Sequence, residues 1–343
     1  MKTLLFTAVL AIIALSSCNK GETLSGAGAT FPAPFYNVVF KDFSNASGIR
    51  VSYGGIGSGG GIRSLQDKTV DFGATDVFLS EKEQAEMGAE VLHIPTAIGG
   101  IVLSYNLPGV EGLRLTNELI SDIYRGVITN WNEPKLQEIN PGISLPDRKI
   151  TPVFRSDGSG TTAVFTEYLT KVNSDWANNI GEGKSINFPA GIAAKGNPGV
   201  AGIIVGTEGA IGYIGSEFAL ALNMATAMLQ NSSGNFVAAN VESISLSANI
   251  DIPADTRVVI TNSSDPNAYP ISTFTWILVY REQAYNNRSE VRAQNLKGLL
   301  QHVISPAGQE IAAKTFYAPL PAVAVERTRA LINSMTFEGK TVN

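Results

Sequence analysis

Glycine, serine and threonine gather in three short clusters, and these residue types together are well suited to hold an anion. The clusters span residues 26–34, 54–61 and 155–162, and the third begins with Arg155. Each stands where a strand-like run gives way to a helix-like run. Backbone N–H groups are free at a helix N-terminus, glycine allows close approach, and hydroxyl groups add donors. One such cluster fits an ordinary helix start equally well, whereas three in one chain favour an anion site.

The second cluster also satisfies the pattern of a dinucleotide-binding turn. Gly55, Gly57 and Gly60 follow a strand pattern and open a helix pattern, and Asp76 lies 21 residues beyond Gly55. Two observations disfavour nicotinamide binding. The run is richer in glycine than the fingerprint requires, and the N-terminus indicates export to a compartment where such cofactors are scarce. We expect a turn of the phosphate-cradling type and no cofactor.

Enzymatic chemistry has little support in the sequence. Neither a Gly-x-x-x-x-Gly-Lys-Ser/Thr run nor a Gly-x-Ser-x-Gly run occurs. The only histidines are His93, in an apolar strand-like run, and His302, in a helix-like run, and both positions are typical of structural histidines. We expect no metal, no catalytic residue and no enzyme. Two alternatives remain open: an exported phosphatase or dinucleotide-dependent oxidoreductase built on the same clusters, and a sensor or adhesion lipoprotein for another oxyanion.

The first 18 residues indicate export and lipid attachment. Lys2 precedes an uncharged apolar run, residues 4–15, that is too short to span a membrane. The Leu-Ser-Ser-Cys ending resembles the bacterial lipobox, in which the cysteine is acylated and becomes the first mature residue. Cys18 is the only cysteine, and acylation explains a lone thiol better than an ordinary signal peptide does. We expect residues 1–17 to be a signal peptide and Cys18 to anchor the chain at the periplasmic or cell-surface face of a bacterial membrane.

Charge and length exclude some partners and predict more than one domain. Removal of residues 1–17 takes away only Lys2, which leaves 24 basic against 30 acidic side chains. An acidic chain is poorly suited to nucleic acid, so we expect no nucleic-acid partner, and a bound anion must be held by local hydrogen bonds. The remaining 326 residues exceed what one hydrophobic core usually accommodates, which predicts two lobes.

Strand-like and helix-like runs alternate along the chain, a pattern typical of an α/β fold. The strand-like runs are residues 49–53, 70–73, 98–105, 149–154 and 271–280. The helix-like runs are residues 61–66, 117–125, 161–169, 290–303, 308–314 and 323–334. The stretch 229–267 is rich in serine, asparagine and aspartate, and we expect it to be irregular.

The motifs closely resemble those of the periplasmic phosphate-binding proteins of the high-affinity phosphate ABC transporter. The matching motifs occupy residues 26–34, 55–58, 70–76, 157–161, 209–213 and 269–273. The resemblance implies a type II periplasmic binding protein with two α/β lobes and a ligand cleft between them. It implies one lobe from residues 24–105 and 270–343 and the other from residues 106–269. It also implies a monomeric receptor that delivers inorganic phosphate to a permease and ATPase complex.

The resemblance further implies which residues contact phosphate. Asp76 is the expected hydrogen-bond acceptor. The expected donors are Thr30, Phe31, Ser58, Arg155, Ser159, Gly160 and Thr161. Asp157, two residues from Arg155, is expected to hold the guanidinium in an ion pair. Gly59 stands where the family more often has serine, and Ser156 where alanine is common, but neither difference removes a ligand.

The carboxylate of Asp76 gives the expected site a preference among anions. Two negative groups repel unless the anion carries a proton that it can donate. Protonated phosphate can donate to a carboxylate, whereas sulfate at neutral pH cannot. An unpaired buried charge costs several kcal/mol, which corresponds to at least about a hundredfold in affinity. Because neutral donors dominate this site, we also expect phosphate affinity to depend only weakly on salt.

Overall fold

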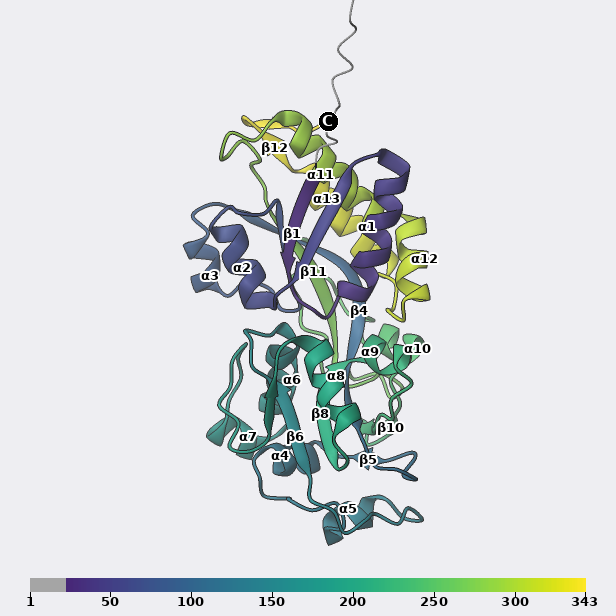
Figure 1. Cartoon of the computed structure of the whole chain (residues 1–343). Coiled ribbons are helices and arrows are strands. Elements are labelled where there is room, and N and C mark those ends of the chain that lie inside the picture. The colour runs from purple at the N-terminus through teal and green to yellow at the C-terminus, as the bar shows by residue number, and fades with distance from the viewer. Residues whose placement is uncertain (1–22) are drawn as a thin grey trace, which may run out of the picture.

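The structure is a computed structural model that describes residues 23–343. The expected signal peptide, residues 1–17, and Cys18 lie outside the described residues. Figure 1 shows two α/β halves stacked along the long axis of the molecule, with strand β4 (Val91–Tyr105) passing from one half into the other. The chain is therefore α/β with two lobes, as the alternating sequence pattern predicted.

One eight-stranded sheet runs through both halves, in the order β2-β1-β3-β11-β4-β8-β6-β7. Besides β4, its strands are β1 (Thr23–Gly28), β2 (Arg50–Gly55), β3 (Phe72–Thr75), β6 (Thr151–Arg155), β7 (Ile192–Ala194), β8 (Ala210–Gly215) and β11 (Ser272–Tyr280). At one end β1 is parallel to β2 and β3, and at the other end β6 is parallel to β7 and β8. Between these groups, β11 is antiparallel to β3 and β4, and β4 is antiparallel to β8.

Strand β4 is long enough to belong to both groups of strands. Residues 91–100 pair with β11, and residues 101–105 pair with β8. We call the half that contains β1, β2, β3 and β11 lobe I, and the half that contains β6, β7 and β8 lobe II. The partner of β4 changes between Gly100 and Ile101, so the chain crosses from lobe I to lobe II at that point.

Helices flank the sheet in both lobes (Figure 1). Those of lobe I are α1 (Ala33–Ser47), α2 (Ser58–Gln66), α3 (Glu81–Glu86), α11 (Glu290–Val303), α12 (Pro306–Lys314) and α13 (Ala322–Asn333). Those of lobe II are α4 (Asn117–Tyr124), α5 (Pro134–Ile139), α6 (Gly160–Val172), α7 (Ser174–Asn179), α8 (Gly196–Gly206), α9 (Ser216–Ala221) and α10 (Val241–Leu246). Among residues 23–343, no helix has both the length and the apolar character needed to cross a membrane.

The remaining strands form two small sheets. One contains β5 (Arg114–Leu115), β9 (Met228–Gln230) and β10 (Phe236–Val237), and the other is the hairpin of β12 (Thr336–Phe337) and β13 (Lys340–Thr341). The stretch expected to be irregular, 229–267, contains most of β9, all of β10 and the short helix α10, and is otherwise turns and loops.

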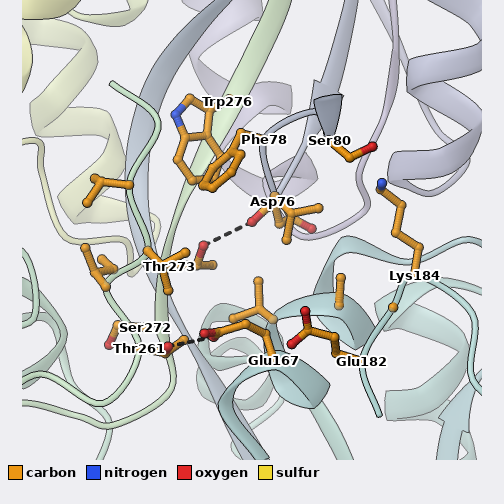
Figure 2. A pocket seen from close by; sticks show the side chains of 17 residues that line it. Asp76, Phe78, Ser80, Glu167, Glu182, Lys184, Thr261, Ser272, Thr273 and Trp276 are labelled. Atoms are coloured by element: carbon orange, nitrogen blue, oxygen red, sulfur yellow. Dashed lines mark hydrogen bonds between the residues drawn. The ribbon is translucent and has the colours of Figure 1, made fainter. Parts of the chain in front are cut away.

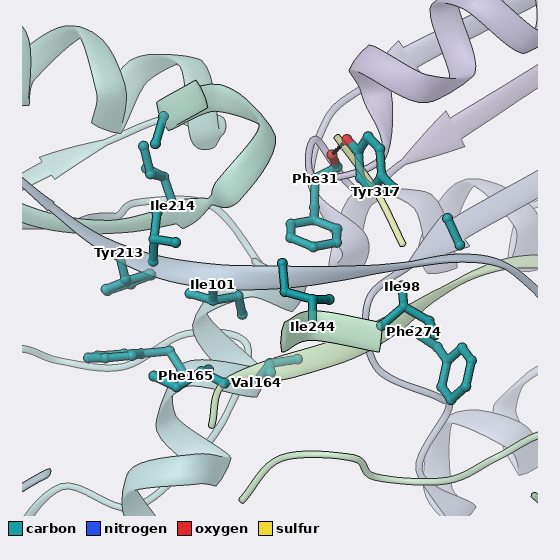
Figure 3. Close-up of a cluster of buried hydrophobic side chains, with 14 of the residues drawn as sticks. Phe31, Ile98, Ile101, Val164, Phe165, Tyr213, Ile214, Ile244, Phe274 and Tyr317 are labelled. Carbon is teal, nitrogen blue, oxygen red and sulfur yellow. Dashed lines mark hydrogen bonds between the residues drawn. The ribbon is translucent and has the colours of Figure 1, made fainter. Parts of the chain in front are cut away.

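A continuous apolar core joins the helices to the sheet in both lobes (Figure 3). Phe31 and Ile98 belong to its lobe I part, and Phe165, Tyr213 and Ile214 to its lobe II part; all are fully buried. The rings of Phe165 and Tyr213 stack with their centroids 4.4 Å apart. Each such side chain contributes about 1.5–3 kcal/mol on burial, so both lobes have a well-packed base on which loops at the strand ends can be held firmly.

Candidate anion-binding site

The carboxyl ends of the parallel strands of both lobes meet at the interface between the lobes, where open α/β sheets usually bind ligands. In lobe I, β1, β2 and β3 end immediately before the segments that contain Thr30, Ser58 and Asp76. In lobe II, β6 ends at Arg155, and β7 ends shortly before α8 begins. Residues that lie more than 100 positions apart in the sequence therefore meet in one place.

Four buried hydroxyl groups line this place, two from each lobe: Thr30, Ser58, Ser159 and Thr161. Each accepts hydrogen bonds from the protein. Ser58 Oγ accepts from the Asp76 N–H at 3.4 Å, and Ser159 Oγ accepts from the Thr162 N–H at 3.0 Å. Among the described residues, none of the four donates its own hydrogen to another protein group. Four hydroxyl hydrogens are therefore available to a ligand at the same site.

Asn197, which the sequence reasoning missed, links the hydroxyls of the two lobes. Its side-chain amide nitrogen donates to Thr30 Oγ1 at 3.1 Å and to Thr161 Oγ1 at 3.2 Å, and its backbone N–H donates to Thr30 Oγ1 at 3.0 Å. Asn197 is fully buried and follows the N-terminal residue of α8. The run Gly196-Asn197-Pro198-Gly199 after a short strand was the available signal, because it is one more glycine-rich strand-to-helix turn.

The N-terminus of α6 points its first turn at the same place. The N–H groups of Gly160 and Thr161 lie in that turn, where a helix offers no internal acceptor. The N–H of Ser159, by contrast, donates to the Lys184 carbonyl at 2.8 Å. Ser159 can therefore serve an anion through its hydroxyl group and not through its backbone.

Gly160 sits where no side chain fits. A Cβ atom there would lie 2.4 Å from Ser58 Oγ and 2.6 Å from Asp76 Oδ2, both in the opposite lobe. The absence of a side chain thus lets α6 approach the strand ends of lobe I closely enough for the two sets of donors to converge.

Arg155 is buried at the site and held by Asp157. Its Nε and Nη2 atoms donate to the two carboxylate oxygens of Asp157 at 2.8 and 2.5 Å, and its Nη1 lies 3.3 Å from Thr161 Oγ1. Burial alone would raise the pKa of Asp157, but hydrogen bonds and charge from Arg155 outweigh it and lower that pKa. The guanidinium is thus kept in one orientation, and its charge is largely neutralised.

Asp76 brings a carboxyl group into the same buried place. Burial raises the pKa of Asp76 to about 7, although the Thr275 hydroxyl and the charge of Arg155 act in the opposite direction. The carboxyl is 1% exposed and accepts from Thr275 Oγ1 at 2.9 Å. A carboxyl group with a pKa this high is present in both its protonated and its ionised form near neutral pH.

Two threonines of β11, which the sequence reasoning did not single out, hold Asp76 in place. Thr275 binds its carboxyl group, and Thr273 Oγ1 lies 3.0 Å from its backbone carbonyl and 2.9 Å from that of Phe274, either of which can accept the single hydroxyl hydrogen. Both lie on a strand far along the chain, and only the pairing of β11 with β3 brings them to Asp76. Thr273 lies in the last matched motif, 269–273, but its residue type alone gives no sign of this contact.

Phe31 anchors the segment after β1. Its ring is fully buried and meets the Tyr317 ring edge-on, with centroids 6.0 Å apart, and its carbonyl accepts from the Tyr317 hydroxyl at 2.5 Å (Figure 3). These two contacts fix the backbone that follows Thr30.

The lobes are in direct contact around the site. The Gly59 N–H donates to the Gly158 carbonyl at 2.9 Å, and Lys184 Nζ lies 2.6 Å from Glu83 Oε1. Together with the bridge from Asn197 to Thr30, these contacts join lobe I to lobe II on several sides of the hydroxyl cluster. The structure is therefore that of the closed protein.

A cavity of about 350 Å³ lies beside the site, between the lobes (Figure 2). It is lined by Asp76, Phe78 and Trp276 from lobe I and by Glu167 and Lys184 from lobe II. None of the four residues that carry the hydroxyl groups lines it, whereas Asp76 belongs to both places.

Each of the two histidines has a hydrogen-bond partner within the protein, as expected of a structural residue. His93 Nε2 accepts from the Leu79 N–H at 3.0 Å, and burial lowers the pKa of His93 to about 4. His302 Nε2 lies 2.9 Å from Asp42 Oδ2. Across residues 23–343, no three histidine, cysteine, aspartate or glutamate side chains gather in a way that could hold a metal ion.

Comparison with known proteins places the chain in a family. Residues 16–307 match the model of the PBP superfamily domain. The phosphate-binding protein PstS of Xylella fastidiosa is 38% identical over 316 residues, which cover 91% of this chain and 85% of that protein. The phosphate-binding protein PstS of Haemophilus influenzae is 35% identical, with 91% of this chain and 92% of that protein covered.

A solved structure shares the fold. It is a high-affinity periplasmic phosphate-binding protein, PfluDING, bound with phosphate, with a TM-score of 0.74 and 20% identity over 90% of this chain and 93% of that one. The architecture is that of the type II periplasmic binding proteins, as the sequence motifs implied. The names of these relatives describe binding proteins and not enzymes. By sequence and by fold, the chain belongs to the family of periplasmic phosphate-binding proteins within the PBP superfamily.

Proposed function

We propose that this chain is an exported receptor that binds one inorganic phosphate ion between its lobes and delivers it to the permease and ATPase complex of an ABC transporter. The observation that carries the proposal is the cluster of four available hydroxyl hydrogens around one arginine and one buried carboxyl group. Phosphate offers both the oxygens that accept from such donors and, when protonated, the hydrogen that a carboxylate accepts.

Each expected ligand has a distinct task in this proposal. Thr30, Ser58, Ser159 and Thr161 donate from their hydroxyl groups. Backbone N–H groups of Phe31, Gly160 and Thr161 add donors, and Arg155 adds charge while Asp157 orients it. Asp76 accepts the proton of the ligand. Neutral donors outnumber charged ones, which suits an acidic chain whose net charge does not attract anions.

The lobes would be the moving parts of the receptor. We assign lobe I to residues 24–105 and 270–343 and lobe II to residues 106–269. The change of β4 pairing between Gly100 and Ile101 supports a crossing within β4, five residues before this boundary. Donors come from both lobes, so phosphate would bind the closed arrangement more tightly than the open one. Binding would therefore shift the protein towards the closed arrangement. The receptor acts as a monomer in this proposal, since one chain supplies every ligand.

Titration calorimetry of phosphate-stripped protein tests the proposal against its alternatives. Phosphate should bind tightly with one site per chain, NAD should give no heat, and a phosphate monoester should not be hydrolysed. Turnover of the monoester, or binding of NAD in place of phosphate, would contradict a transport receptor.

Membrane attachment is a separate part of the proposal. Acylation of Cys18 after removal of residues 1–17 would tether the receptor to the periplasmic or cell-surface face of a bacterial membrane, and more than one acyl chain makes such anchoring stable. Mass spectrometry of the mature N-terminus should find acylated Cys18, and Cys18→Ser should release the protein from membranes with its phosphate affinity unchanged. An unmodified Cys18 in protein isolated from the membrane fraction would contradict lipid anchoring.

A further inference from the structure

Glu217 is a buried carboxyl group to which the proposed function assigns no task. It stands in the first turn of α9, immediately after β8, and is 1% exposed. Among the described residues, neither of its carboxyl oxygens has a hydrogen-bond partner of normal geometry. The carboxyl folds back over Gly215, where a Cβ atom would lie 2.0 Å from Glu217 Oε1. An ionised carboxylate without partners costs several kcal/mol in such a place.

The neighbouring hydroxyl group of Tyr317 can relieve an ionised Glu217 only by giving up its hydrogen bond to Phe31. Tyr317 belongs to lobe I and lies beside Glu217, but its single hydrogen is donated to the Phe31 carbonyl at 2.5 Å. Its oxygen can therefore only accept from Glu217, and an ionised carboxylate can also only accept. A protonated Glu217 resolves the conflict, because its O–H can donate to Tyr317 Oη while Tyr317 continues to donate to Phe31.

We propose that Glu217 is protonated in the closed protein and that its O–H donates a hydrogen bond to Tyr317 Oη, so that closure of the lobes takes up one proton at this residue. Opening separates α9 of lobe II from Tyr317 of lobe I and returns the carboxyl group to water, where it ionises. Glu217 is thus a positioning residue. It acts through Tyr317 on the Phe31 segment, and its effect on ligand affinity rests on the proposed binding of phosphate beside that segment.

The surroundings of Glu217 favour the protonated form. Burial raises the pKa of Glu217 well above its usual range, and the charge of Asp76 acts in the same direction; its own backbone N–H and the Tyr317 hydroxyl act in the opposite direction but are outweighed. The elements packed against α9 are α8, β8 and β4. Helix α8 has no ionisable side chain, β8 has only Tyr213, and β4 has His93 and Tyr105 near its two ends. No cation among these elements compensates an ionised Glu217.

The sign of the pH dependence follows from this arrangement. The pKa is raised in the closed protein and ordinary in the open one. The contribution of Glu217 to closure is therefore complete below the ordinary pKa of glutamate and is lost as the pH rises through the raised pKa. Within that interval, phosphate affinity of the wild type should fall by up to about tenfold per pH unit relative to a variant that cannot ionise at this position.

Proton uptake on phosphate binding tests the proposal directly. Calorimetry at pH 7 in two buffers of different ionisation enthalpy should show that Glu217→Gln takes up about one proton fewer per phosphate than the wild type. The glutamine is neutral, and its amide can donate to Tyr317, so affinity should be retained while the pH profile flattens. Glu242→Gln, an exposed first-turn glutamate of α10, should behave like the wild type. Equal proton uptake in the wild type and Glu217→Gln would overturn the proposal.

Infrared difference spectra give a second readout that does not rely on affinity. Addition of phosphate to the wild type should produce the carbonyl stretch of a protonated carboxyl group that Glu217→Gln lacks. Should that variant fail to fold, Tyr317→Phe should shift the band, because the hydrogen bond of the carboxyl group is lost, and an unchanged band would contradict the assignment. Failure of the wild type to bind phosphate would instead refute the proposed function, and the carboxyl band of phosphate-free protein would then decide the protonation of Glu217.

Discussion

A carboxyl group inside an anion site selects among anions by whether they carry a proton. Asp76 is buried, held by Thr275, and close to the hydroxyl groups of both lobes. A ligand that can donate a hydrogen satisfies it, whereas a fully ionised oxyanion faces it with two like charges. The residue that disfavours anion binding in general therefore provides the selectivity proposed for phosphate over sulfate.

Substitution of this residue gives the first prediction. Asp76→Asn should narrow the ratio of phosphate to sulfate affinity by at least about tenfold, because the amide no longer repels sulfate and can donate to it. Calorimetric titration with both anions measures the ratio, and Asp251→Asn, an exposed position, serves as control. An unchanged ratio would refute the acceptor role of Asp76.

The raised pKa of Asp76 gives a second prediction, on stability. The folded protein binds this proton up to about pH 7, whereas the unfolded chain releases it near 3.8. The contribution of the residue to stability is thus present at low pH and is lost as the pH rises through 7. The urea midpoint of phosphate-free protein should be higher at pH 5 than at pH 8, and Asp76→Asn should reduce that difference. A difference that the variant leaves intact would show that other groups cause it.

Sequence reasoning at the residue scale reached donors in glycine-rich turns but not the residues that support them. Thr30, Ser58, Ser159 and Thr161 lie in clusters whose composition indicates an anion site. Thr275 lies in a strand and Glu217 at a helix start, and neither local sequence is unusual. Only tertiary packing brings Thr275 to the carboxyl group of Asp76 and buries the carboxyl group of Glu217 without a hydrogen-bond partner of normal geometry. A buried polar contact between segments distant in the sequence leaves no local pattern.

At the scale of elements, the runs named from the sequence end within a few residues of the observed strands and helices, except at β4, whereas helices α1 and α8 were not delimited from the sequence. Strand β4 begins at Val91, whereas the apolar pattern suggested Ile98. Pro95 interrupts that pattern because it cannot donate to a ladder, yet the sheet accommodates it where the register with β11 shifts, between Thr275 and Trp276. Helix α6 is buried along most of its length, because it packs against β8, α4 and α7 while its first residue, Gly160, lies against Ser58 and Asp76 of lobe I.

The glycine at the start of α6 gives a third prediction. Gly160→Ala should lower phosphate affinity by at least about tenfold, because its Cβ would collide with Ser58 and Asp76 when the lobes close. Gly202→Ala, in α8 with no atom within 4 Å of the added Cβ, is the matched control. It should leave affinity unchanged and stabilise the protein by about 0.5–1 kcal/mol. Equal affinities for the two variants would contradict the close approach of α6 to lobe I.

At the scale of the whole molecule, the sequence indicated two lobes through its length and its alternating pattern. The order of the strands could not be obtained in this way, because β11 is inserted between β3 and β4 from a segment almost 200 residues downstream. Nor could the closed arrangement, which depends on contacts such as that between Lys184 and Glu83. The assignment of residues 24–105 and 270–343 to one lobe stays a prediction, and the proposed opening and closing of the lobes depends on it.

The ion pair between the lobes gives a fourth prediction. Glu83→Gln should weaken phosphate binding by no more than about fivefold and should speed release, because a partly exposed pair contributes about 1 kcal/mol or less. Glutamine preserves the capping box that Glu83 forms with Ser80, so α3 itself should stay intact. Glu86→Gln on the same helix is the control, and stopped-flow release rates distinguish the two variants. Identical release rates would show that the pair does not help hold the lobes together.

The most direct test of a cleft that selects phosphate by hydrogen-bond matching is a pair of titrations of the phosphate-stripped wild-type protein at about pH 9, where Asp76 is ionised and phosphate still carries a proton, one with phosphate and one with sulfate. Phosphate should bind at one site per chain at least about a hundredfold more tightly than sulfate, because only phosphate can donate to the ionised Asp76. Sulfate binding as tight as that of phosphate, or no phosphate binding at all, would contradict this description of the site.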